Sequence, residues 1–322
     1  VGAPARRDIA RKIRVKNVRR EADGILGLTI EDAKGRSLPG WSAGAHIEVC
    51  LEGFDRKYSL CGRADGSDYD IAVLLEEDAR GGSRRIHEVA AEGLELRLRG
   101  PSNLFRLDEQ ASSYVLIAGG IGITPILAMA DRLKALGRDY TIHYCGRSRE
   151  SMAFLDRLQA DHPGRLAIYA GDEGARADLT AIVAGLHDGG QIYACGPQRM
   201  ISQLEDLTAS HPAGTLHFEH FSAQETALDP SKESAFQVEL KDSGLTLEVA
   251  ADVTLLDALL ASGIDIACDC REGLCGSCEV EVLEGEIDHR DVVLTRTERA
   301  ENRRMMSCCS RSVKGGKVKL AL

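Results

Sequence analysis

With 322 residues, the chain is longer than one ordinary hydrophobic core requires, and two or three domains are expected. Hydrophobic residues make up 43% of the chain and charged residues 28%, values that are typical of a soluble globular protein. The formal net charge of −10 argues against a nucleic-acid-binding protein, because contacts to phosphates require clustered cations.

The N-terminal segment is basic but contains no apolar stretch that resembles a signal peptide. We interpret the basic residues as the solvated face of a first strand and a loose tail; a docking or targeting role is the alternative. The longest apolar run, residues 114–130, is broken by three glycines and a proline, which indicates a strand, a turn and a helix start rather than a membrane span. Ten cysteines in a long chain, gathered mainly near its C-terminus, indicate a reducing compartment, so we expect a cytoplasmic protein that binds no membrane.

Residues 1–107 are predicted to form an antiparallel β-domain. Apolar and polar residues alternate along 46–51 and again along 94–99, as they do in strands with one buried face. Turns rich in Gly, Asp and Pro separate about six short strands, a pattern that predicts a barrel.

Two stretches of this domain have the composition of a ligand site. The first is a strand that presents a cation, an aromatic ring and a hydroxyl group, formed by Arg56, Lys57, Tyr58 and Ser59. The second places a glycine pair and a serine at the start of a predicted helix, in the run Arg80, Gly81, Gly82 and Ser83. Backbone N–H groups and the helix dipole converge at such a helix start, which makes it a natural phosphate cradle. Each motif alone is more often an ordinary strand or loop.

Residues 108–222 alternate between apolar strands and amphipathic helices, which predicts a parallel sheet with helices on both faces. The predicted strands are 115–118, 141–144, 166–169 and 191–194, and the predicted helices are 126–136, 179–186 and 200–209. The residues that follow each strand meet at one edge of such a sheet, and nucleotides bind at that edge in open α/β folds.

A glycine-rich turn follows the first of these strands and contains Gly119, Gly120 and Gly122. Thr124 is predicted to cap the next helix and Pro125 to lie in its first turn. The turn lacks the spacing of the dinucleotide fingerprint G-x-G-x-x-G, but it leaves glycine backbone at the nucleotide-binding edge. The last strand of the sheet ends at the same edge with Cys195, Gly196 and Pro197.

The segment from His217 to His220 contains two histidines and a carboxylate. In an extended chain His217 and Glu219 point one way and His220 the other, so a mononuclear iron site is not expected. The polar and aperiodic residues 223–235 are interpreted as a linker. Residues 236–322 predict a hairpin, a short helix and two further strands, which together form a small mixed sheet of the β-grasp type.

The cysteines of this last domain form the most specific motif in the chain. The spacing C-x4-C-x2-C, followed by a distant cysteine, is formed by Cys270, Cys275, Cys278 and either Cys308 or Cys309. It is the plant-type spacing for a 2Fe-2S cluster, in which a tight loop supplies three thiolates and a distant segment the fourth. A structural zinc site is the alternative, but such sites usually consist of two short cysteine pairs. Cys268 has the wrong offset and is interpreted as a spectator.

Taken in chain order, these motifs resemble the phthalate dioxygenase reductase family, to which vanillate demethylase reductases are similar. The resemblance covers nearly the whole chain and includes the segment 217–219. It implies a multidomain fold in which an antiparallel β-barrel binds flavin mononucleotide (FMN), an α/β domain binds NADH, and a β-grasp ferredoxin domain binds the 2Fe-2S cluster.

The resemblance also implies roles for individual residues. Arg56 would hold the FMN phosphate, Tyr58 would lie against the flavin ring, and Ser59 would approach the flavin N5 atom. Cys195 would lie near the nicotinamide, and Cys308 rather than Cys309 would be the fourth cluster ligand. The implied cofactor-binding set is Arg56, Lys57, Tyr58, Ser59, Ala72, Val73, Leu74, Arg80, Gly81, Gly82, Ser83, Gly119, Gly120, Gly122, Thr124, Arg147, Cys195, Gly196, Pro197 and Phe221, the last at the position of an aromatic ring that holds the place of the nicotinamide.

Two positions depart from the family pattern. Leu74 stands where a lysine is frequent, so one flavin contact is expected to be missing. Ser148 stands where an acidic residue would favour NADH, and the flanking Arg147 and Arg149 would suit a 2′-phosphate. NADH remains the expected coenzyme.

The expected function is that of an NADH-dependent oxidoreductase, the reductase component of an oxygenase. Electrons would pass from NADH to FMN, then singly to the cluster and on to a terminal oxygenase, expected to be of the Rieske type and to act in aromatic catabolism. Hydride transfer requires no side-chain acid or base, so none is assigned. The alternatives are an FAD-containing reductase that serves a P450 or diiron oxygenase, and a non-catalytic electron carrier or redox sensor. One polypeptide with all three redox groups is expected to act as a monomer.

Overall fold

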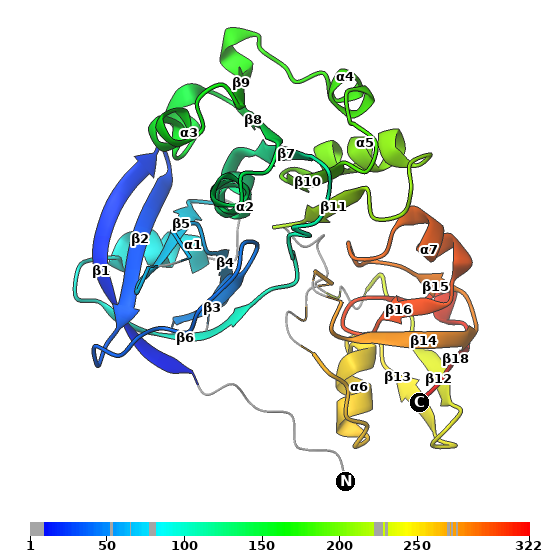
Figure 1. Cartoon of the computed structure of the whole chain (residues 1–322). Coiled ribbons are helices and arrows are strands. Elements are labelled where there is room, and N and C mark those ends of the chain that lie inside the picture. Colours follow the sequence, from blue (N-terminus) through cyan, green and yellow to red (C-terminus); the bar gives the residue numbers. More distant parts are fainter. Residues whose placement is uncertain are drawn as a thin grey trace. The chain divides into compact units, whose positions relative to one another are not determined.

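The computed structural model describes residues 10–51, 54–64, 66–76, 82–221, 228, 231–268, 271, 273–274 and 276–322. The fold divides into two compact units, one that ends at Glu219 and one that begins at His220. The first unit contains a β-barrel and an α/β domain, and the second is a small mixed sheet with a helix (Figure 1). Among the described residues, no helix combines the length and apolar character needed to cross a bilayer.

Antiparallel strands form the barrel, namely β1 (Arg11–Ala22), β2 (Ile25–Asp32), β3 (His46–Leu51), β4 (Phe54–Ser59), β5 (Tyr69–Leu74) and β6 (Glu95–Ser102). They pair in the order β4-β3-β6-β1-β2-β5, and the edge strands β4 and β5 contact each other, which closes the sheet. Helix α1 (Gly82–Val89) contacts β4 and β5. Alternate residues such as Ile13 and Val15 are buried, so the two-residue period of the strands fills the barrel interior as predicted.

The basic residues of β1 pair with acidic residues of the same barrel. The ion pairs are Arg11–Asp32, Lys12–Glu95, Arg14–Glu31, Lys16–Asp68, Arg19–Asp70 and Arg20–Asp23. Most of these pairs lie at the surface, where an ion pair stabilises the fold only weakly, whereas the Asp32 side chain is buried. Their combined effect is to neutralise the basic run, which confirms its interpretation as the solvated face of a strand.

The α/β domain contains the parallel strands β7 (Tyr114–Gly119), β8 (Tyr140–Gly146), β9 (Leu166–Ala170), β10 (Gln191–Cys195) and β11 (Leu216–Glu219). They pair in the order β11-β10-β7-β8-β9, so the chain switches direction across the sheet between β7 and β10. Helices α2 (Ile123–Ala135) and α3 (Leu155–Asp161) pack in the core on one face, and α4 (Leu179–Ala184) and α5 (Gln198–Thr208) pack in the core on the other. The predicted parallel sheet is confirmed.

One detail of the predicted turn is wrong. Helix α2 begins at Ile123, immediately after a 3₁₀ turn, and its N-cap is Gly122. Thr124 therefore lies inside the first turn, where its hydroxyl donates to the carbonyl of Ile121 (3.0 Å) instead of capping the helix. Pro125 lies in the first turn, as expected.

The second unit contains a sheet with the order β13-β12-β18-β14-β16. Its elements are β12 (Phe236–Leu240), β13 (Thr246–Val249), α6 (Leu255–Ala261), β14 (Glu279–Glu284), β15 (Ile287–Asp288), α7 (Arg296–Glu301), β16 (Arg304–Met306), β17 (Arg311–Ser312) and β18 (Val318–Leu320). The last strand, β18, is the central one, parallel to β12 and antiparallel to β14. Leu255 and Leu259 of α6 pack on this sheet together with Phe236 and Val238, which gives the predicted grasp-like fold.

A buried arginine joins the segment that precedes β12 to the rest of this unit. Arg311 is 2% exposed, and its Nε atom lies 3.2 Å from Oε2 of Glu233. Its other nitrogens donate to the carbonyls of Val253, Ser234 and Ala250. Because a buried guanidinium is tolerated only when its donors are satisfied, this network fixes residues 233 and 234 on the unit.

Candidate functional site

Arg56 and the first turn of α1 lie side by side on the barrel. The Nε atom of Arg56 lies 3.0 Å from the position that a Cβ on Gly82 would occupy, so a side chain at Gly82 would crowd the guanidinium. The first N–H groups of a helix have no partners within it, and with a guanidinium beside them they suit a dianionic phosphate. The structure thus brings together two motifs that are separate in the sequence. Arg80 and Gly81, two further predicted members, lie outside the described residues.

Strand β5 and Ser83 complete this part of the predicted site. The hydroxyl of the buried Ser83 accepts a hydrogen bond from the backbone N–H of Glu76 (3.2 Å). The side chain of Val73 belongs to the barrel core, so only its backbone remains to meet a ligand. Ala72 packs in the core shared with the α/β domain, and Leu74 is half-buried against that core.

Tyr58 and Ser59 end strand β4. Burial raises the pKa of the Tyr58 hydroxyl far above its ordinary value, so this group is a neutral phenol. Ser59 is 4% exposed, and its Oγ donates to Oε2 of Glu219, which lies 3.5 Å away. The end of the barrel strand β4 therefore reaches the end of strand β11 of the parallel sheet.

Glu219 is a residue of this site that sequence reasoning missed. It is paired with Cys195 across β10 and β11, at the edge where nucleotides bind in such sheets. Burial raises its pKa to about 7, although Ser59 and Lys57 lower it. The segment 217–219 belongs to the motifs of the family resemblance, but the resemblance assigns no role to this carboxylate, and the only role weighed for it from the residues is that of an iron ligand.

The glycine turn after β7 packs directly on the end of β10. A Cβ on Gly122 would lie 2.2 Å from the carbonyl oxygen of Cys195, and one on Gly119 would lie 2.5 Å from Cδ of Pro197. Gly120 has a φ of +57° and open space at its Cβ position. The edge of the sheet therefore presents bare backbone, which allows a pyrophosphate to approach closely.

The side chains of Cys195 and Thr124 are buried beneath the backbone of this edge. Cys195 is fully buried, and burial raises the pKa of its thiol well above the ordinary value, so the thiol stays neutral and is not a nucleophile. Thr124 is 2% exposed, and its hydroxyl is bonded within the turn. Direct contact of these two side chains with a cofactor remains a prediction.

The loops after β8 and β9 form the other side of the same edge. The backbone N–H of Asp172 donates to the carbonyl of Arg147 (2.9 Å), which ties the two loops together. Arg149 donates to both carboxylate oxygens of Glu173, from Nε at 2.7 Å and from Nη2 at 3.2 Å. Ser148 faces Ser151, with 3.4 Å between the hydroxyl oxygens. One of the two arginines that flank Ser148 is therefore held in an ion pair.

Two of the predicted cluster ligands lie close together in the second unit. Cys278 and Cys308 are each 3% exposed, and a hydrogen bond between them, with burial, raises the pKa of Cys278. The same bond lowers the pKa of Cys308, but the thiol of Cys309 and burial outweigh it and raise the value to about 12. These thiols give up their protons at neutral pH only to a metal. The other two predicted ligands, Cys270 and Cys275, lie outside the described residues.

Two glycines near these cysteines have left-handed backbone conformations. Gly273 and Gly276 have φ values of +70° and +74°, which favour glycine. A Cβ on Gly273 would lie 2.7 Å from Sγ of Cys309. The thiols share an apolar environment that includes Leu256 and Leu294, and a set of buried thiols in an apolar shell fits an iron–sulfur cluster.

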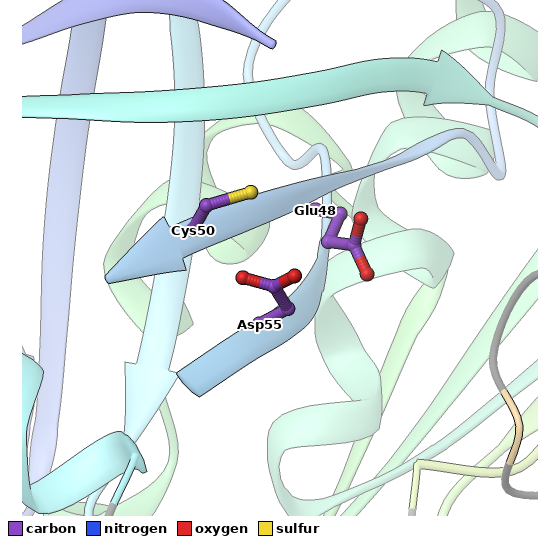
Figure 2. A group of neighbouring side chains, drawn as sticks. All are labelled: Glu48, Cys50 and Asp55. Atoms are coloured by element: carbon purple, nitrogen blue, oxygen red, sulfur yellow. The ribbon is translucent and has the colours of Figure 1, made fainter. Parts of the chain in front are cut away.

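A second group of metal-ligand type lies on the barrel, as Figure 2 shows for Glu48, Cys50 and Asp55. Their ligand atoms lie within 4.8 Å of one another. Nη1 of Arg99 lies 2.8 Å from Oε2 of Glu48 and 2.9 Å from Oδ2 of Asp55, so a guanidinium already occupies the space between the two carboxylates. Burial raises the pKa of Cys50 to about 11, so its thiol is protonated. We interpret this group as an ion-pair cluster rather than a metal site.

The segment from His217 to Glu219 does not converge on a metal. His217 stacks on Tyr193 with 4.6 Å between the ring centroids, whereas Glu219 bonds Ser59. Phe221 belongs to the unit that begins at His220, and its side chain is 39% exposed. Its predicted place against the flavin stays a prediction.

Comparisons with known proteins agree with this arrangement. A model of the 2Fe-2S iron-sulfur cluster binding domain matches residues 238–313, and a model of the N-terminal domain of dimethylamine monooxygenase subunit DmmA-like proteins matches residues 96–215. The phenoxybenzoate dioxygenase subunit beta of Ectopseudomonas oleovorans is 43% identical over 303 residues, which cover 93% of this chain and 94% of that protein.

Two solved structures resemble the whole chain. Phthalate dioxygenase reductase, described as transferring electrons from pyridine nucleotides to a 2Fe-2S cluster, has a TM-score of 0.72 and 34% identity over 97% of this chain and 98% of its own. An intact type IV self-sufficient cytochrome P450 monooxygenase has a TM-score of 0.81 and 53% identity over 100% of this chain, which spans 43% of that longer protein.

These similarities confirm the predicted fold class, with its antiparallel barrel, parallel α/β domain and ferredoxin domain. They also support a cofactor set of a 2Fe-2S cluster, a flavin and NADH. The chain therefore belongs to the phthalate dioxygenase reductase family of oxidoreductases.

Proposed function

We propose that this protein oxidises NADH and delivers the electrons, through bound FMN and a 2Fe-2S cluster, to an oxygenase. These groups would supply the conversion of a two-electron donor into single-electron transfers. The observation that carries the proposal is the contact of Ser59 with Glu219, because it joins the ligand strand of the barrel to the nucleotide edge of the parallel sheet. A flavin on β4 and a nicotinamide at the end of β10 would therefore meet.

The protein's own part is to bind, orient and exclude water. Arg56 and the first turn of α1 would hold a terminal phosphate, and the dianionic phosphate of FMN suits this cradle better than the diphosphate of FAD. Ser59 Oγ, which donates to Glu219 Oε2, would lie at the edge of the flavin. Glu219, with a pKa of about 7, would hold or release a proton beside that edge.

The cluster would be held by Cys270, Cys275, Cys278 and Cys308. The proximity of the last two thiols supports this assignment. We further propose a monomer with an FMN domain at 1–107, an NADH domain at 108–222, a linker at 223–235 and a ferredoxin domain at 236–322. The strands of each sheet fall within these limits.

The identity of the oxygenase is the finer question. The 53% identity with a self-sufficient P450, against 43% with the dioxygenase subunit, favours a P450 haem as the electron acceptor. A Rieske-type oxygenase that acts on an aromatic acid is the second candidate, and the similarity to the dioxygenase subunit supports it.

The test uses the full chain with its cluster and flavin in place. We expect the protein to be yellow-brown and to reduce ferricyanide when NADH is added. Acid treatment should release FMN. Anaerobic mixing with a P450 or with a Rieske oxygenase then reports which centre is reduced, by the haem carbon monoxide spectrum or by the Rieske electron paramagnetic resonance signal. A loaded protein that does not oxidise NADH with any one-electron acceptor would refute the proposal.

A further inference from the structure

The ion pair between Arg149 and Glu173 lies at the edge of the sheet where the ribose of a dinucleotide is read. Arg149 follows β8 and Glu173 follows β9, next to the switch point between β7 and β10. In folds of this kind the residue after the second strand meets the 2′ position of the ribose, where an acid selects NADH and an arginine selects NADPH.

The pair is bidentate and partly exposed. Both carboxylate oxygens of Glu173 are used, by Nε and Nη2 of Arg149. The side chains are 44% and 47% exposed, so a phosphate could reach the guanidinium without unfolding of the loop if Glu173 did not occupy it. The pair is held near β8 because Asp172, next to Glu173, is bonded through its backbone to Arg147.

The charges around this pair favour a neutral ribose over a phosphorylated one. The carboxylates of Glu173, Asp172 and Glu150 all act on the Arg149 guanidinium and raise its pKa. Arg147 is exposed and forms no ion pair with any residue in the described part of the chain. A 2′-phosphate would add two negative charges beside these carboxylates, and Arg149 is already paired with one of them.

We propose that Glu173 determines the choice of coenzyme, because it holds Arg149 in a two-point ion pair and so withholds that guanidinium from a ribose 2′-phosphate. The proposal rests on the proposed oxidation of a nicotinamide nucleotide. It assigns the discrimination to a carboxylate on the loop after β9, although the residues that sequence reasoning singled out lie after β8.

The test is a cycle of substitutions at the two positions. Glu173→Gln is expected to raise the ratio of kcat/KM for NADPH over NADH about tenfold, the discrimination that one charge-assisted hydrogen bond supplies. Arg149→Gln alone should leave the ratio nearly unchanged, and the double variant should return to the parent ratio. A purely structural role of the loop would instead change both coenzymes together.

A binding measurement separates this inference from the proposed function. Calorimetric titration of 2′,5′-ADP and of 5′-AMP into the same proteins measures two affinities, and their difference is the contribution of the 2′-phosphate to binding. Only 2′,5′-ADP should bind more tightly to Glu173→Gln, and the gain should vanish without Arg149. If the parent oxidises neither coenzyme, the proposed function fails while this titration still decides the inference.

A matched control lies at the opposite edge of the same two strands. Asp139 and Arg165 form an exposed ion pair (3.0 Å) just before β8 and β9. Asp139→Asn should change neither the ratio of kcat/KM for NADPH over NADH nor the affinity for 2′,5′-ADP. An unchanged ratio and an unchanged affinity for 2′,5′-ADP in Glu173→Gln would overturn the proposal, as would a gain that persists in the double variant.

Discussion

Replacement of Glu219 by glutamine should change how the stability of the first unit depends on pH. Burial raises the pKa of this carboxyl group from 4.5 to about 7 in the folded protein. The folded state therefore binds this proton more tightly than the unfolded chain does, and stability falls as the pH rises from 4.5 to about 7. The loss amounts to about 3 kcal/mol at 1.36 kcal/mol for each pKa unit. Glutamine has the same shape and no proton to lose, so Glu219→Gln should escape this loss.

Differential scanning calorimetry of the full chain, at pH values below 4.5 and above 7, measures the effect. We follow the unfolding transition of the unit that ends at Glu219. As the pH rises, the free energy of unfolding of the variant should increase relative to that of the parent by about 3 kcal/mol. Glu92→Gln, which alters an exposed carboxyl group of the same unit, should follow the parent at every pH. Parallel pH profiles for the parent and Glu219→Gln would refute the assignment of a buried carboxyl with a raised pKa.

Three further outcomes are expected. Arg56→Gln should weaken FMN binding about tenfold or more, measured by quenching of flavin fluorescence, because one charge-assisted contact to the phosphate is lost; an unchanged affinity would place the phosphate elsewhere. Cys308→Ser should remove the cluster absorbance and the electron paramagnetic resonance signal whereas Cys309→Ser should keep both, and the reverse result would exchange their roles. Glu233→Gln should destabilise the second unit by about 3 kcal/mol, seen as a lower melting temperature, because its carboxylate is the ion-pair partner of the buried Arg311 and is also bonded by both terminal nitrogens of Arg290; a melting temperature equal to the parent's would show that the backbone carbonyls and Asp288 suffice.

Regular elements with a strong period could be predicted from the sequence. Strand β3 was placed correctly because polar and apolar residues alternate along it, and four of the five parallel strands were placed because each is a short apolar run. Strand β11 was missed, because Leu216–Glu219 is short and half polar. The spacing of the cysteines is local, so it identified the ferredoxin domain without any knowledge of tertiary structure. Helix α3 was missed, because it is short and its N-cap is Phe154, a residue in left-handed conformation with no capping side chain.

The contacts between distant residues could not be predicted. Ser59 and Glu219 meet although 160 residues separate them, and nothing in either local pattern marks the other as a partner. The same holds for Arg149 and Glu173, which follow different strands. The prediction that Thr124 caps the helix was wrong for a local reason. A 3₁₀ turn continues directly into α2, so the helix begins at Ile123, before Thr124.

The central position of β18 has a consequence for how the protein is made. This strand lies between β12 and β14 in the sheet, yet it follows both of them in the chain. Until it has been made, β12 and β13 on one side of the sheet and β14 and β16 on the other have no strand to join them. The neighbourhood of Cys278 and Cys308 depends instead on the pairing of β14 with β16, so it can assemble before β18 completes the sheet.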